Sequence, residues 1–108
     1  RLARAMRDAL ADGGRAILRT PNMANVFGVY SRYMDLTHQT GFTEQSLTQL
    51  LRLAGFTRVD LIVPEFPADH GLAEQIARSR RFHRELFELQ DRAMPRCFDK
   101  NLVVAAYA

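Results

Sequence analysis

The chain has 108 residues, 47% hydrophobic and 25% charged, a composition that fits one globular domain and excludes a disordered segment. The formal net charge is only +3, and the arginines at residues 78–84 lack the broader basic surface of a nucleic-acid binder, so we expect no nucleic-acid partner. No apolar run approaches the roughly 20 residues that span a bilayer. A single cysteine, Cys97, excludes an internal disulfide, and we expect a cytoplasmic protein without a membrane partner.

The chain begins with a predicted helix and a predicted strand. Apolar residues spaced three and four apart favour an amphipathic helix over residues 1–11, which the Gly-Gly pair at 13–14 ends. The apolar run "RAILRT" then predicts a strand over residues 15–20. Because the chain starts inside a helix and without a methionine, we expect Arg1 to begin an excerpt from a longer protein.

The middle of the chain continues the strand into a strand–helix–strand unit. After a polar and aromatic loop, Thr43 is a good N-cap for a helix over residues 44–54, whose leucines form one apolar stripe. Gly55 ends this helix, and "RVDLIVPE" predicts a strand over residues 58–63. Such a crossover implies that the two strands pair in parallel or share a parallel sheet.

The last third predicts a long helix and a final strand. Helical periodicity runs over residues 72–94 and stops at Pro95, and "NLVVAAYA" predicts a strand over residues 101–108. The arginines at 78–84 indicate a solvated helix face; the alternative is that they attract a phosphate-bearing or acidic substrate. The three histidines and the cysteine have no spacing typical of a zinc site, so we expect no metal.

A block of residues between positions 21 and 56 has the form PN…RYxDxTHxxxFTxxSLxxLLxxAGF. Its members are Pro21-Asn22, Arg32-Tyr33-Met34-Asp35-Leu36-Thr37-His38, Phe42-Thr43, Ser46-Leu47, Leu50-Leu51 and Ala54-Gly55-Phe56. With the preceding helix, Gly-Gly pair and strand, this block resembles the C-terminal half of bacterial class I S-adenosylmethionine-dependent methyltransferases.

The resemblance implies an α/β fold, the C-terminal part of a Rossmann-like seven-stranded methyltransferase sheet with its flanking helices. Residues 1–108 would be a single partial domain, the substrate-side half. The three predicted strands would be strands five, six and seven of that sheet, and the last would lie antiparallel between the other two.

The resemblance also implies a function and a cofactor. The family binds S-adenosylmethionine mainly through a Gly-rich turn and an acidic residue of its N-terminal half, and this chain has neither. The cofactor-binding residues are therefore unknown here. We expect a methyltransferase that forms part of a longer chain and transfers a methyl group to a small-molecule or saccharide acceptor. O-methylation is expected, and the segment alone is expected to be inactive.

The loop after strand 15–20 contains the candidate catalytic residues, because ligands in open α/β sheets bind outside the carboxyl ends of the strands. His38 is the candidate general base for a hydroxyl acceptor, and Asp35, three residues earlier, is the candidate that orients it. The alternative is that both side chains bond the loop backbone and hold the entry into helix 44–54.

The same loop contains the candidate substrate-binding residues, Asn22, Tyr30, Arg32 and Tyr33. Asn22 follows a proline, so its alternative role is to form the turn there. The alternative for the aromatic side chains is that they anchor the loop in the core.

Two further hypotheses come from other classes of function. The segment could be a non-catalytic interaction module that forms a homodimer, because an unpaired edge of strand 15–20 invites pairing with another chain. Nucleic-acid binding through the arginine-rich helix is the third hypothesis, which predicts a salt-dependent interaction with DNA.

Overall fold

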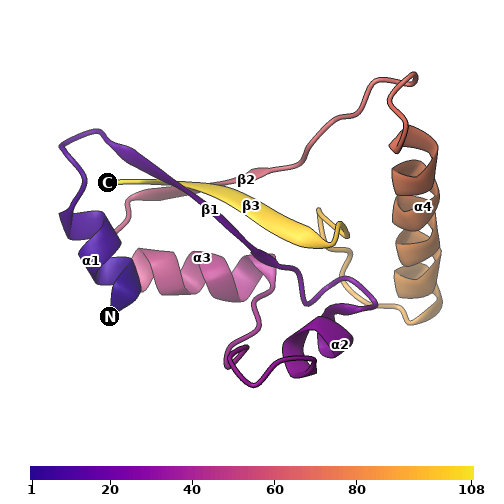
Figure 1. The fold of residues 1–108 in the computed structure, drawn as a ribbon, viewed down its shortest axis with the longest axis horizontal. Helices are drawn as coiled ribbons and strands as arrows, with labels where there is room; N and C mark the ends of the chain where they lie inside the picture. Colours follow the sequence, from indigo (N-terminus) through magenta and orange to yellow (C-terminus); the bar gives the residue numbers. More distant parts are fainter.

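The computed structural model describes all of residues 1–108 as a three-stranded sheet with helices on one face and at one end (Figure 1). Its strands are β1 (Arg15–Pro21), β2 (Arg58–Ile62) and β3 (Asn101–Tyr107), and its helices are α1 (Leu2–Asp8), α2 (Gly28–Tyr33), α3 (Glu44–Leu53) and α4 (Ala73–Leu89). The predicted mixed α/β architecture is confirmed. None of the four helices has the length and apolar character needed to traverse a bilayer.

The last strand of the chain is the central strand of the sheet. The order is β1-β3-β2, and β3 runs antiparallel to both neighbours. β1 and β2 run parallel to each other but do not pair, so the parallel pairing that the crossover predicted is wrong, because β3 lies between them. The register places Val104 of β3 opposite both Leu18 of β1 and Leu61 of β2. The predicted placement of the last strand, antiparallel between the other two, is confirmed.

α3 starts where its sequence predicts. Thr43 is the N-cap: its Oγ1 accepts a hydrogen bond from the Ser46 backbone N–H at 3.3 Å, and Ser46 Oγ accepts one from the Thr43 N–H at 3.0 Å. This reciprocal pair satisfies backbone donors that a helix start otherwise leaves free.

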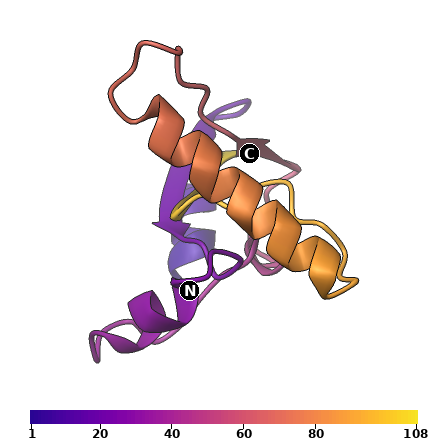
Figure 2. The ribbon, with the colours of Figure 1, turned by 90° about the vertical axis from the view of Figure 1, so that its right-hand side faces the viewer.

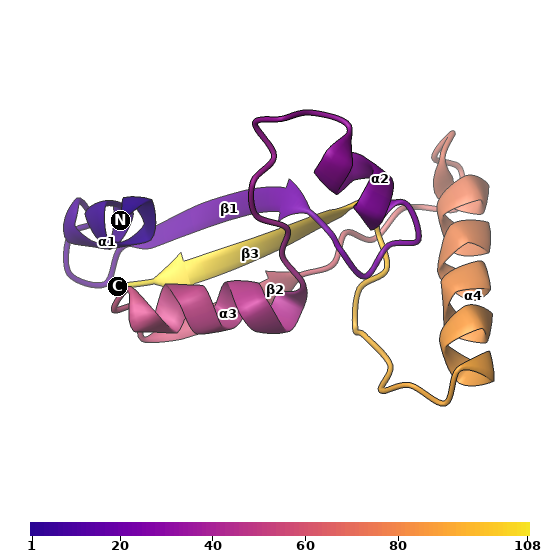
Figure 3. The ribbon, with the colours of Figure 1, turned by 90° about the horizontal axis from the view of Figure 1, so that it is seen from below.

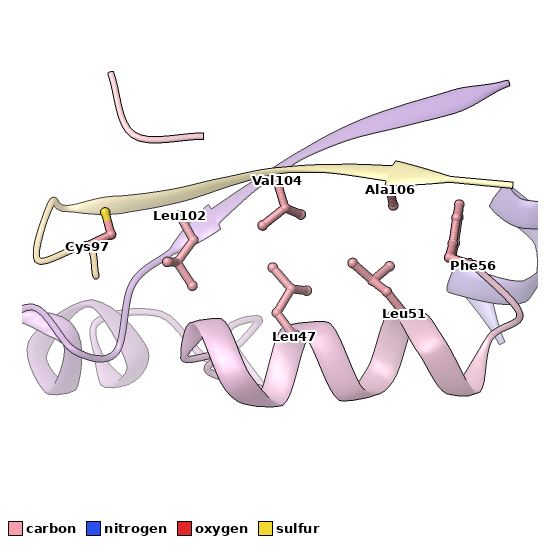
Figure 4. Close-up of a cluster of buried hydrophobic side chains, with 7 residues drawn as sticks. All are labelled: Leu47, Leu51, Phe56, Cys97, Leu102, Val104 and Ala106. Carbon is pink, nitrogen blue, oxygen red and sulfur yellow. The ribbon is translucent and has the colours of Figure 1, made fainter. Parts of the chain in front are cut away.

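The hydrophobic core lies between α3 and one face of the sheet (Figure 4). Leu47 and Leu51 point from α3 toward the side chains of β3, which alternate between the two faces of the sheet. α1 packs against the same core, and α1 and α3 therefore cover one face (Figure 3). The core cluster consists of Leu47, Leu51, Phe56, Cys97, Leu102, Val104 and Ala106.

The opposite face of the sheet is covered by neither α1 nor α3. On this face Ile17 of β1 is 56% exposed, and Ile62 of β2 is also exposed. β1 and β2 are the two edge strands, so each leaves one row of backbone groups without a strand partner.

α4 stands at the end of the sheet, apart from α1 and α3 (Figures 1 and 2). Arg80 attaches it to the body through a two-pronged pair with Asp99, at 2.9 Å and 2.7 Å, and through a bond to the Pro64 carbonyl at 2.9 Å. The hydrogen bonds to Asp99 raise the pKa of the Arg80 guanidinium above its ordinary value. The prediction that all arginines of residues 78–84 lie on a solvated face is therefore wrong for Arg80.

Several predicted boundaries differ from the structure, and the helix predicted over residues 1–11 spans only Leu2–Asp8. The helix predicted over residues 72–94 ends at Leu89, because the chain turns at Asp91 with a φ of 47°, a left-handed conformation that a helix cannot continue through. The loop after β1, which the sequence describes as irregular, contains the short helix α2. Gly28 begins α2, and a Cβ there would lie 2.8 Å from the Cα of Met23.

Burial of Cys97 leads to a reactivity prediction. The thiol lies in the core, and burial raises its pKa, so little nucleophilic thiolate is present. We expect iodoacetamide to alkylate the native chain about a hundred-fold more slowly than the urea-unfolded chain, because alkylation must await opening of the core. Equal rates in the two states, measured by mass spectrometry, would contradict the described core.

Candidate functional site

The end of β1 and the loop that follows it form the candidate site. A bridge of parallel type joins Asn22 to Phe42, with the Met23 N–H donating to the Phe42 carbonyl at 3.0 Å. The loop between them therefore leaves the sheet and returns to the same place. α2 and the rest of the loop consequently lie at the end of the sheet where both parallel strands stop (Figure 1).

Asn22 is a structural residue. It is 1% exposed, and its side-chain amide donates to the carbonyls of Cys97 at 2.9 Å and Asp99 at 3.0 Å. Its Oδ1 accepts from the Ala24 N–H at 2.9 Å, which forms the turn after Pro21. Each amide hydrogen is used inside the protein, so the prediction that Asn22 offers its amide to a substrate is corrected.

His38 is held in one tautomer. Its Nδ1 lies 2.7 Å from the carbonyl oxygen of Ser31, and a carbonyl can only accept, so Nδ1 carries the proton and donates it. Nε2 is left as an acceptor with no hydrogen-bond partner in the protein. This is the state in which a neutral imidazole can take a proton from a hydroxyl group.

Asp35 is bonded to Thr37 rather than to His38. Its Oδ1 accepts from both the Thr37 hydroxyl and the Thr37 backbone N–H, each at 2.7 Å. These hydrogen bonds, the hydroxyl first, lower the pKa of the carboxyl from its ordinary value of 3.8. Asp35 thus shapes the turn that leads into His38, and no hydrogen bond between their side chains is present.

The lowered pKa of Asp35 predicts how the loop responds to acid. A carboxyl that titrates lower in the folded loop stabilises that loop above pH 3.8, and the contribution is lost as pH falls through the folded pKa. We expect the Thr37 amide resonance to shift with a midpoint below pH 3.8, and the shift to vanish in Asp35→Asn. A midpoint above pH 3.8 would contradict the described turn.

Arg32 holds the backbone at His38 and the following residue in place. Its guanidinium donates to the carbonyls of both His38 and Gln39, and it lies 5.0 Å above the ring centre of Tyr33. Tyr30 and Tyr33 are 69% and 76% exposed, so the alternative that these aromatics anchor the loop in the core is wrong. They stand on the outside of α2, where a ligand or partner could reach them.

A hollow of about 290 Å³ lies beside His38. Its walls come from the end of β1, from α2 and from residues 37–41, and most of the residues in them are polar. The structure brings two candidate residues, His38 and Arg32, to this hollow. The other four, Asn22, Tyr30, Tyr33 and Asp35, do not line it.

His83 is a buried polar residue to which the sequence gives no role. It is 2% exposed, its Nδ1 lies 2.7 Å from the Ser79 carbonyl, and its Nε2 accepts from the Val26 N–H at 2.9 Å. Its ring stacks on Phe98 with centroids 5.6 Å apart. His83 therefore fixes α4 to the loop after β1, and its position on the apolar stripe of α4 was the available signal.

The described residues include no group of three His, Cys, Asp or Glu side chains that could hold a metal ion. The Gly-Gly pair at residues 13–14 precedes β1 and follows α1, so it opens no helix toward a ligand.

Comparison with solved structures finds a likeness to the crystal structure of a SAM dependent methyltransferase from Archaeoglobus fulgidus, with a TM-score of 0.59 and 14% sequence identity. The likeness covers 99% of this chain and 50% of that protein, so the chain spans half its length. At this identity the likeness shows the fold alone, a methyltransferase-like α/β fold. No protein-family model and no curated protein sequence matches the chain.

Proposed function

We propose that the chain is the C-terminal, substrate-side half of an S-adenosylmethionine-dependent methyltransferase. The observation that carries the proposal is the sheet: β3 lies antiparallel between two strands that are parallel to each other, as the resemblance implies. In this proposal β1, β2 and β3 are strands five, six and seven of a seven-stranded sheet. The likeness to half of a SAM dependent methyltransferase supports it.

The residues present do not fit a cofactor site of the methyltransferase type. The turn that would present backbone amides to S-adenosylmethionine follows the first strand of such a sheet, whereas β1 and β2 are proposed as its fifth and sixth strands. We therefore assign this chain only the acceptor side and expect it to be inactive alone.

His38 is proposed to act as the general base toward an acceptor hydroxyl. Its tautomer leaves Nε2 free, and Ser31, Arg32 and the Asp35–Thr37 turn fix the ring and the backbone around it. In this role Nε2 takes the proton of the hydroxyl, and the oxygen becomes the nucleophile. Asp35 serves as a positioning residue through Thr37. Tyr30 and Tyr33 would contact an acceptor from the rim.

Methyl transfer tests the proposal. The 108-residue chain and a chain extended upstream in its gene would be given S-adenosylmethionine with a labelled methyl group and a panel of hydroxylated small molecules and saccharides. We expect labelled product only with the longer chain. Methyl transfer by the short chain alone would contradict the proposal. The absence of transfer with both chains and every acceptor would also contradict it.

The unpaired edge of β1 favours an alternative function, a non-catalytic dimerisation module. The outer edge of β1 is unpaired, and Ile17 on this strand is exposed. An unpaired strand edge of this kind can pair with a second copy of the chain. This alternative predicts that the 108-residue chain sediments as a dimer and that the Ile17→Lys variant sediments as a monomer. A wild-type chain that stays monomeric at high concentration would exclude it.

A further inference from the structure

A cavity of about 500 Å³ between α4 and the sheet has no role in the candidate site described above. It is lined from β1 by Arg19, from β3 by Val103, which pairs with Arg19, and from the segment after β2 by Pro64. Both parallel strands therefore end beside it, which is where open α/β sheets bind ligands. It has the volume typical of small-molecule sites.

One part of the cavity is apolar. Phe66, Leu72 and Ile76 come from the segment before α4 and from its first turns, and Pro64 and Val103 complete this wall. Apolar side chains that converge on a cavity of this volume favour a ligand with an apolar body, because filling the cavity removes both surfaces from water.

The charged lining is positive. Arg19 and Lys100 both line the cavity, and neither takes part in any of the chain's three ion pairs. The only acidic group in the lining, Asp99, is neutralised by the two-pronged pair with Arg80. The cavity therefore offers two unpaired cations and no unpaired anion, and such a lining attracts a negatively charged group.

We propose that this cavity binds a compact organic anion, with its apolar body against Phe66, Leu72 and Ile76 and its carboxylate or phosphate beside Arg19 and Lys100. The role of this anion as the acceptor rests on the proposed function, whereas its binding does not. If this anion is the methyl acceptor, the cavity binds its apolar body and its anionic group. The hydroxyl group that receives the methyl group is then a third part of the same molecule.

Amide resonances of the labelled 108-residue chain test the binding directly. The probes are 1-naphthoate and 1-naphthyl phosphate, which are apolar ring systems with an anionic group, and 1-naphthamide, a neutral analogue of the first. We expect the two anions to shift the resonances of Gln75, Ile76 and Val103, and the neutral probe to bind more weakly at the same residues. The tighter of the two anions identifies the preferred head group.

The variant Arg19→Gln/Lys100→Gln removes both cations from exposed positions. We expect it to weaken binding of the anions about ten-fold and to leave binding of 1-naphthamide unchanged. Arg52→Gln, on the exposed side of α3, is the matched control and should change neither. Unchanged affinity of the double variant for the anions, or resonance shifts confined to other surfaces, would overturn the proposal.

This experiment uses neither S-adenosylmethionine nor turnover. A chain that binds no naphthalene anion would leave the methyltransferase proposal intact, whereas a longer chain without methyl transfer would leave the anion site intact. The two failures are therefore distinguishable.

Discussion

In a chain extended upstream that shows methyl transfer, replacing His38 by alanine is expected to lower turnover by about a hundred-fold or more, the usual loss when a general base is removed. The structure supports this size of effect because Nδ1 is tied to the Ser31 carbonyl and Nε2 is left free to accept a proton. Turnover would be measured as release of S-adenosylhomocysteine with a saturating acceptor.

His38→Gln separates the chemical role from a structural one. Glutamine can still donate to the Ser31 carbonyl, so it should preserve the loop, but it cannot take a proton and should lose as much turnover as alanine. Gln49→Ala, at an exposed position on α3, is the control for effects of mutagenesis and purification, and it should retain full activity. A loss of only a few-fold in His38→Ala would refute the assignment of His38 as the base.

Replacing Asn22 by alanine is expected to destabilise the 108-residue chain by about 3 kcal/mol, because the change leaves one buried and two partly buried backbone groups without partners. Those groups are the carbonyls of Cys97 and Asp99 and the N–H of Ala24. Asn22 therefore holds the start of β3 to the end of β1, and its loss should loosen both the sheet and the candidate site. Urea unfolding followed by circular dichroism measures the change.

Asn101→Ala is the matched control, because Asn101 begins β3 beside this network and its side chain forms no hydrogen bond in the protein. A surface substitution of this kind should change stability by no more than about 0.5 kcal/mol. Equal stability of Asn22→Ala and the wild-type chain would mean that the buried network is absent and that Asn22 is free for another role.

The elements of the fold were predictable because short stretches of sequence specify each helix and strand. The arrangement of the strands was predictable because the order of these elements resembles a known family. Thr43 before a leucine stripe predicted α3, and the apolar runs predicted all three strands within two residues of their observed ends. The central place of β3 could be predicted only through the resemblance, because strand composition alone does not say which strands pair.

The candidate site was less predictable because its contacts join residues distant in sequence. The hydrogen bonds of Asn22 reach residues more than 70 positions away, and the pair between Arg80 and Asp99 bridges a helix and a loop. Nothing in the local sequence distinguishes Arg80 from the exposed arginines beside it. The spacing of Asp35 and His38 suggested a side-chain pair. Instead, Thr37 lies between them, and its backbone N–H and its hydroxyl both donate to Asp35.

Calorimetric titration with S-adenosylhomocysteine tests whether this chain is the acceptor side of a methyltransferase. It would be applied to the 108-residue chain and to the chain extended upstream by about half a domain. We predict binding to the extended chain alone, because in the proposed function the residues that hold the cofactor lie outside this segment. Binding to the short chain would contradict the assignment of this segment to the acceptor side, and binding to neither would contradict the methyltransferase proposal itself.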